Sequence, residues 1–241
     1  ILISTYMDGT MTKGKKFDAK LLQVLTQLSA AGIDVLISTG RSAGWVQAIA
    51  TYLPVVGAIA ENGGLVYWNH DPQPHLIGEI DIIQHRRELQ RVFLLLQDKF
   101  PHIRESLDNP FRMTDWTFEV ENLSPVELKQ IELICQSQGY GFTYSTIQCH
   151  IKPFYQDKAY GLNKIISQHF SYLKPSEIVT IGDSPNDESM FNQVEFPLSV
   201  GVANVVKYCD RLKYLPAYVT KESEGAGFCE LAALTLLCPE E

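Results

Sequence analysis

The chain has 241 residues, of which 45% are hydrophobic, and its formal net charge is −8. This length and composition supply a large buried core and predict one large domain or two modest ones. The acidic balance, without a cluster of Lys and Arg, excludes a nucleic-acid-binding surface, which needs positive charge to displace counterions from phosphates. No apolar stretch reaches the ~20 residues needed to cross a bilayer, so no membrane partner is expected.

Five cysteines are scattered along the chain without a C-x-x-C pair: Cys135, Cys149, Cys209, Cys229 and Cys238. The ligand spacings expected of zinc are missing, so these residues are interpreted as reduced, mostly buried thiols. Reduced thiols are typical of an intracellular compartment, and the sequence therefore predicts a cytoplasmic protein.

Apolar runs of strand length alternate with segments of helical period over the first sixty residues. Strands are expected at residues 1–5, 33–38 and 57–60, with helices over 18–31 and 43–53 between them. This alternation predicts an α/β fold with a doubly wound, Rossmann-like parallel sheet covered by helices on both faces.

The pattern changes after residues 66–68. The polar segment 69–74 carries two prolines and is interpreted as a turn. Beyond it the pattern is α+β, with helices expected over 83–100 and 125–137 and strands near 103–107, 112–120, 142–145 and 149–152. We interpret residues 81–152 as an α+β cap domain inserted into a core domain formed by residues 1–80 and 153–241.

The alternating pattern resumes after the insert. A helix is expected over 158–170, a strand over 178–182, a short helix after Pro185, a strand over 196–200 and a last helix over 227–237. The core is therefore split in the sequence.

Polar residues follow the first two core strands, and ligands of open parallel sheets sit at the carboxyl ends of strands. The turn Asp8-Gly9-Thr10 is able to direct backbone N–H groups at an anion, although an Asp-Gly pair is also an ordinary turn. Thr39-Gly40-Arg41 opens a helix, which suits either a phosphate or a plain helix cap.

Two further loops follow the insert. Lys158 begins a helix, where a cation opposes the helix dipole unless an anion faces it; the alternative is an ordinary exposed lysine. Asp183 and Asp187 flank Asn186 after a buried strand, where two carboxylates repel unless a cation lies near them. Hard oxygen ligands without nearby Cys or His favour Mg²⁺, and the alternative is a capping role alone.

Together these four loops resemble the motifs of the haloacid dehalogenase superfamily. Glu61-Asn62-Gly63-Gly64 and Glu224-Gly225-Ala226-Gly227 are similar to its Cof-like and sucrose-phosphatase-like branch, which carries an α/β cap. The resemblance covers nearly the whole chain. It implies a Mg²⁺-dependent phosphatase acting on a small phosphorylated metabolite, for which a sugar phosphate or related acid is expected. The acidic charge and the inserted cap are compatible with a monomer or a homodimer.

The resemblance also implies a role for each site residue. Asp8 is the general acid and base and offers its backbone carbonyl to Mg²⁺, with Asp183 and Asp187 completing the metal site. Phosphate-binding residues are expected at Gly9, Thr39, Gly40, Arg41, Lys158 and Asn186.

Tyr6 stands at the position of the family's nucleophilic Asp. A Tyr with a pKa of about 10 is roughly 0.1% ionised at pH 7, and a neutral phenol is a poor ligand for Mg²⁺. Three explanations are open: a substitution or sequence error in an ordinary phosphatase, a binding or regulatory relative that has lost turnover, or an activated Tyr6 that forms a phosphotyrosyl intermediate.

Five residues of the insert are candidates for touching a sugar, but aromatic residues on strands usually pack, so we interpret them as cap surface or cap core. They are Arg112, Trp116, Tyr144, His150 and Lys152.

Overall fold

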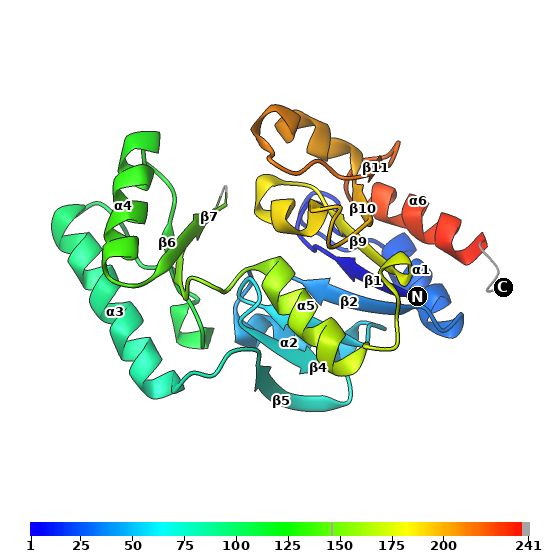
Figure 1. The fold of residues 1–241 in the computed structure, drawn as a ribbon, viewed down its shortest axis with the longest axis horizontal. Coiled ribbons are helices and arrows are strands. Elements are labelled where there is room, and N and C mark those ends of the chain that lie inside the picture. The colour runs from blue at the N-terminus through cyan, green and yellow to red at the C-terminus, as the bar shows by residue number, and fades with distance from the viewer. Residues whose placement is uncertain (146, 238–241) are drawn as a thin grey trace.

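The computed structural model describes residues 1–145 and 147–237, and Cys238 lies outside these residues. It contains an eight-stranded sheet with the strand order β11-β10-β9-β1-β2-β3-β4-β5 and a three-stranded sheet with the order β6-β8-β7. In Figure 1 the small sheet and its two helices lie to the left of the large sheet. The α/β class with a Rossmann-like core and an additional α+β layer is confirmed, while the domain boundaries at residues 81 and 152 stay a prediction.

Six strands of the large sheet run parallel, and β1 lies at its centre between β2 and β9. The central strands read as continuous apolar runs because helices cover both faces of the sheet. Their bounds are β1 Leu2–Thr5, β2 Asp34–Ser38, β3 Gly57–Ala60, β9 Ile178–Gly182, β10 Leu198–Gly201 and β11 Tyr218–Val219.

The other edge of the large sheet is antiparallel, formed by β4 Leu65–Trp68 and β5 Asp71–Leu76. The turn predicted over residues 69–74 is therefore wrong, because most of that segment belongs to β5. Pro72 and Pro74 are tolerated there because β5 is an edge strand, on which a missing N–H need not break a ladder on both sides.

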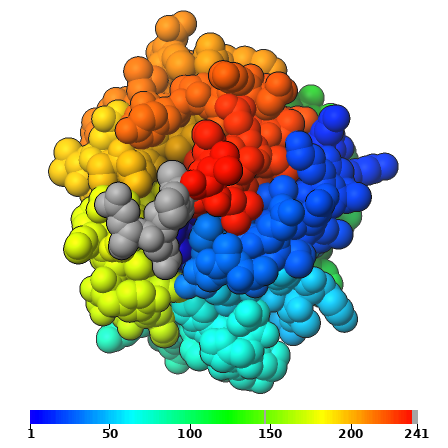
Figure 2. Space-filling view, turned by 90° about the vertical axis from the view of Figure 1, so that its right-hand side faces the viewer, coloured from blue at the N-terminus to red at the C-terminus, as the bar shows by residue number. Residues whose placement is uncertain are grey.

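Helices cover the two faces of this sheet. On one face α1 Ala19–Ala30, α2 Ala43–Tyr52 and α6 Glu224–Leu237 pack on the side chains of Ile3, Val35 and Ile37. On the other, α5 Lys158–His169 packs on Leu2 and Leu36. Neighbouring strand residues thus enter different cores, as the two-residue strand period requires. Figure 2 shows α6, in red, against the blue N-terminal segment that includes α1.

The small sheet consists of β6 Trp116–Glu119, β7 Gly141–Tyr144 and β8 Gln148–Lys152. One of its faces packs on α3 Ile82–Lys99 and α4 Pro125–Ser137 through residues such as Phe118 and Ile151. The strand predicted at 103–107 is reduced to one bridge, Glu105 to Phe118. The strand predicted over 112–120 begins at Trp116, because the three residues before it bind the core through Glu61.

In the described part of the chain, four 3-10 helices complete the fold: η1 Asn109–Phe111, η2 Pro175–Glu177, η3 Pro185–Phe191 and η4 Ala203–Arg211. Of these, only η3 was predicted, β11 was not, and α6 begins three residues earlier than expected. Within the described ranges, no helix is both long and apolar enough to span a bilayer.

Candidate active site

A cleft of about 660 Å³ lies between the carboxyl edge of the large sheet and the small sheet. Core loops supply one wall and β7 and β8 supply the other, including Gln148 and His150. Seven of the predicted site residues line it: Tyr6, Asp8, Thr39, Gly40, Arg41, Asp183 and Asn186. The structure thus brings together loops that are far apart in the sequence.

Asp8 and Arg41 form a two-pronged ion pair at this cleft. Arg41 Nε donates to one carboxylate oxygen at 3.0 Å and Nη2 to the other at 2.8 Å. Such forked, charge-assisted pairs fix the orientation of both groups. The Arg41 guanidinium also lies over the Trp45 ring, with Cζ 5.4 Å from its centroid. Arg41 was predicted to bind phosphate, whereas in this structure it holds the predicted acid and base.

Lys158 and Asp187 form a second ion pair beneath the cleft. Lys158 Nζ lies 2.6 Å from Asp187 Oδ1, and the two side chains are 1% and 0% exposed. Asp187 Oδ2 accepts hydrogen bonds from the backbone N–H groups of Asp183 and Ser184 at 2.9 and 3.2 Å. Lys158 is therefore not an ordinary exposed lysine, and both Asp187 oxygens already have partners.

Asp183 lies against the first core loop. Its oxygens accept hydrogen bonds from the Thr10 hydroxyl at 3.0 Å and from Asn204 Nδ2 at 3.1 Å. Burial, and next the charge of Asp187, raise the pKa of Asp183 to about 7. Gly9 makes this contact possible, because a Cβ there would lie 2.5 Å from Asp183 Oδ2 and its φ is +85°.

The fit of this site to Mg²⁺ depends mainly on Asp183. Within the described part of the chain, no group of three or more His, Cys, Asp and Glu side chains is arranged to hold a metal ion. Asp183 and the Asp8 carbonyl are hard oxygen ligands, and Mg²⁺ is commonly held by one or two carboxylates while it keeps several waters. The residues thus fit the ion through one carboxylate, and the three-residue metal set remains a prediction.

Tyr6 fills the place of the missing carboxylate. It is 9% exposed, and Lys158 Nζ lies 3.5 Å from its ring centroid. Burial raises the pKa of the Tyr6 phenol well above its ordinary value, and the carboxylates of Asp187, Asp8 and Asp183 raise it further. A phenolate at this position is therefore disfavoured, which argues against the phosphotyrosyl explanation.

Two asparagines outside the predicted set connect the site loops. Asn204, on η4, donates to the Gly9 carbonyl at 3.2 Å as well as to Asp183, and it accepts from the Glu224 N–H at 2.9 Å. Asn62 accepts from Asn186 Nδ2 at 3.4 Å. Asn204 had no signal of its own, but the resemblance at residues 61–64 and 224–227 marked the segments that contain Asn62 and that contact Asn204.

The five cap candidates divide into three groups. Tyr144 and His150 line the cleft, and Trp116 belongs to the cap core as interpreted. Arg112 and Lys152 are buried. Their contacts are with protein groups, since Lys152 Nζ donates to the Gln156 carbonyl and Arg112 forms ion pairs with Asp108 and Asp115.

Comparison with known proteins identifies the family of the chain. A family model described as haloacid dehalogenase-like hydrolase matches residues 3–86 and 105–228. A phosphoglycolate phosphatase of Methanococcoides burtonii is 29% identical over 231 residues, covering 93% of this chain and 91% of the relative. One of Sulfolobus acidocaldarius is 28% identical over 237 residues, covering 95% and 93%.

Solved structures share the fold over almost the whole chain. A protein of Thermoplasma acidophilum superposes with a TM-score of 0.79 at 22% identity and covers 98% of both chains. The sucrose-phosphatase of Synechocystis, solved with sucrose and phosphate, has a TM-score of 0.73 at 15% identity and covers 97% of both. Since the family model matches most of its residues, the chain belongs to the haloacid dehalogenase-like hydrolases and is by descent one of their phosphatases.

Proposed function

We propose that the cleft is a Mg²⁺-dependent phosphatase site for a small phosphorylated acid, and that Tyr6 holds hydrolysis far below the rate of a carboxylate-bearing site. The buried Lys158 carries this proposal, since its Nζ lies 3.5 Å from the ring centroid of Tyr6, which lines the cleft, and a lysine that is only 1% exposed is costly unless it meets anions. Asp187 is one such anion, and a phosphoryl group entering beside Thr39 is the second.

The surrounding residues suit phosphoryl transfer, whose barrier depends mostly on positioning and charge. Thr39 and Asn186 line the cleft and offer hydrogen bonds to phosphoryl oxygens. Asp8, oriented by Arg41, is placed to pass a proton to the leaving oxygen and then to take one from water. Mg²⁺ held by Asp183 would offset the charge of the phosphoryl oxygens.

The relatives suggest the substrate class. Several are named phosphoglycolate phosphatases, so a short acid that carries both a phosphate and a carboxylate is the first candidate. A sugar phosphate, expected from the sequence, is the comparison substrate. Both suit a cleft of about 660 Å³ that is closed on one side by the small sheet.

A second candidate is a protein that binds such an ester without turning it over. Tyr6 favours it, because a buried phenol with a raised pKa supplies neither an ionised nucleophile nor a charged metal ligand. This candidate uses the same cleft and ligand, so it differs from the first in turnover alone.

The test compares the parent chain with Tyr6→Asp, using phosphoglycolate, a sugar phosphate and p-nitrophenyl phosphate with Mg²⁺ or with EDTA. We expect Tyr6→Asp to release phosphate at least about 1,000 times faster than the parent. A carboxylate at position 6 is ionised at pH 7, whereas a phenol with an ordinary pKa is only about 0.1% ionised. The double variant Tyr6→Asp with Asp8→Asn is the matched control and should lose that gain.

Three outcomes separate the candidates. Turnover by Tyr6→Asp supports the phosphatase site, and binding of phosphoglycolate by the parent without turnover selects the second candidate for this chain. If neither protein hydrolyses or binds any of the three esters, the site is not a phosphoester site and the proposal fails.

A further inference from the structure

Arg112 belongs to the cap segment and contacts the phosphate loop, defined here as Thr39-Gly40-Arg41. Its side chain is 0% exposed, and Nη1 donates to the Gly40 carbonyl at 3.1 Å. The rest of the guanidinium is held by cap residues: Asp115 at 2.9 Å, Asp108 at 2.8 Å and Gln148 at 3.1 Å. One arginine thus ties three cap side chains to a backbone group of the core site.

The phosphate loop is supported from a second side by Asn62. A Cβ at Gly40 would lie 3.0 Å from Asn62 Oδ1, so the loop packs closely on this side chain. Asn62 Nδ2 lies 3.4 Å from His150 Nδ1, and that histidine nitrogen is 2.8 Å from Asp115 Oδ2. The contacts that run through Arg112 and those that run through Asn62 and His150 therefore both end at the buried carboxylate of Asp115.

Glu61 fastens this cap segment to the start of α2. Its Oε1 accepts hydrogen bonds from the N–H groups of Ala43, the first residue of α2, at 2.9 Å and Met113 at 3.0 Å. Its Oε2 accepts from the Thr114 N–H at 2.6 Å and hydroxyl at 2.8 Å. Glu61 is 0% exposed, so each lost bond would leave a buried polar group unpaired, which proteins rarely tolerate.

From these contacts we infer that Arg112 is a positioning residue, which holds the phosphate loop in its binding geometry through the Gly40 carbonyl. Glu61 keeps Arg112 in reach by fixing the neighbouring cap residues. The cap thereby contributes to phosphoryl binding at a distance, without contact between Arg112 and the ligand. The inference rests on the proposed function only in naming the loop's ligand.

The primary test is amide hydrogen exchange in the parent chain, which does not depend on turnover. Arg112→Lys keeps the charge beside Asp108 and Asp115 but loses the planar fork that also reaches Gly40. We expect amides of residues 39–46 to exchange about tenfold faster or more, consistent with the loss of a hydrogen bond to a charged group, while strand β1 is unchanged.

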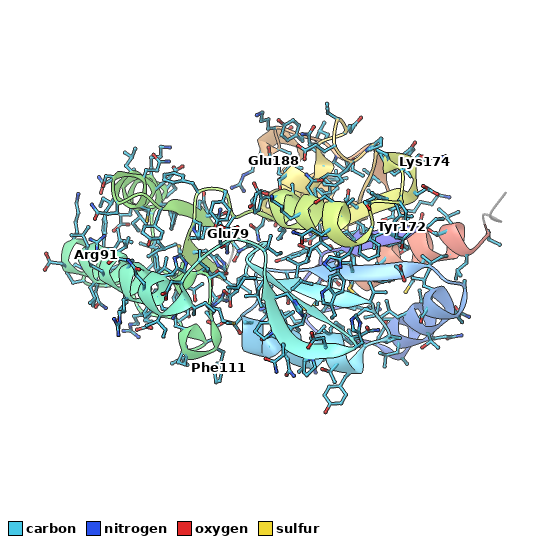
Figure 3. The ribbon with its side chains drawn as sticks, turned by 60° about the horizontal axis from the view of Figure 1, so that its bottom comes forward. Glu79, Arg91, Phe111, Tyr172, Lys174 and Glu188 are labelled. Carbon is cyan, nitrogen blue, oxygen red and sulfur yellow. The ribbon has the colours of Figure 1, made fainter. Side chains whose placement is uncertain are left out.

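Arg86→Lys is the matched control. Arg86 is a half-buried cap arginine that donates to the Asp115 and Asn109 carbonyls, next to the Arg112 network, and within the described residues its hydrogen bonds do not reach the phosphate loop. Arg91→Lys is a second control, because Arg91 lies on the outer end of the cap in Figure 3 and pairs with Glu88. Neither substitution should change exchange at residues 39–46.

If Arg112→Lys raises amide exchange throughout the core, the variant has lost global stability, and Gln148→Met is measured in its place. Gln148→Met removes only one cap partner of Arg112, and it should likewise raise exchange at residues 39–46 and leave strand β1 unchanged. In the Tyr6→Asp background, Arg112→Lys should also weaken competitive inhibition by inorganic phosphate roughly tenfold without a matching fall in kcat. Unchanged exchange at residues 39–46 in the folded variant, or an equal change in Arg86→Lys, overturns the inference whatever the hydrolysis assay shows.

Discussion

Replacing Tyr6 with Asp should destabilise the protein in EDTA and make its stability depend on Mg²⁺. The substitution removes a side chain that is 9% exposed, together with the contact of its ring with Lys158 at 3.5 Å. It also adds a fourth carboxylate beside Asp8, Asp183 and Asp187. Deleting a buried aromatic side chain typically costs 3–5 kcal/mol, and attraction between the new carboxylate and Lys158 offsets part of this. We expect a net loss of about 3 kcal/mol.

Mg²⁺ should return most of that loss, because an ion that binds only the folded state adds about 2.7 kcal/mol at a concentration 100 times its Kd. The assay is urea unfolding of the parent and Tyr6→Asp at pH 7.5, with EDTA and with a Mg²⁺ series. Tyr6→Phe is the control, since it keeps the ring under Lys158. The reasoning is refuted if Tyr6→Asp is as stable as the parent in EDTA, or if Mg²⁺ stabilises both proteins equally.

Three other predictions concern the same site. Tyr6→Phe should match the slow hydrolysis of the parent, and a fall of tenfold or more would show that the Tyr6 hydroxyl takes part. The affinity of the Tyr6→Asp variant for Mn²⁺, followed by electron paramagnetic resonance, should rise with pH up to about 7 and then level off. The sign follows because burial raises the pKa of Asp183 to about 7, so metal binding at lower pH must displace its proton; an affinity independent of pH between 5 and 7 would exclude Asp183 as a ligand. Arg41→Lys in the Tyr6→Asp background should lower kcat about tenfold through loss of the fork to Asp8, and an unchanged kcat would mean that Asp8 needs no such support.

The parallel core could be predicted because its signals are local. Strand 178–182 of the core has the bounds that its apolar run indicates, and in the cap the helix 125–137 has the bounds that Pro125 and its N-cap residue Ser124 indicate. Errors occur where tertiary contacts override the local pattern. The strand was predicted to begin at residue 112, but four donors from residues 113–115 are directed at Glu61 instead. Likewise, the prolines of residues 69–74 suggest a turn from the sequence alone, whereas in the folded chain most of this segment pairs with β4 as an edge strand.

The candidate site could be assembled from sequence because its residues lie in short loops after strands. Pairing within the site could not be predicted in the same way. Arg41 follows a phosphate-loop pattern, but only the folded chain shows that its guanidinium reaches Asp8 from a loop 33 residues away. Asn204 carries no local pattern that marks it, and Arg112 was considered only as a sugar contact, because their roles depend on contacts with backbone carbonyls of distant loops.

Both outer strands of the large sheet are poor templates for another chain. At one edge, β5 has Pro72 and Pro74, which have no N–H to offer to an incoming strand. At the other edge, β11 is two residues long, too short for a stable ladder with a second molecule. Sheet extension between copies is thereby blocked at both ends, so the β-rich core should resist domain swapping and fibril growth at the concentrations needed for binding and exchange measurements.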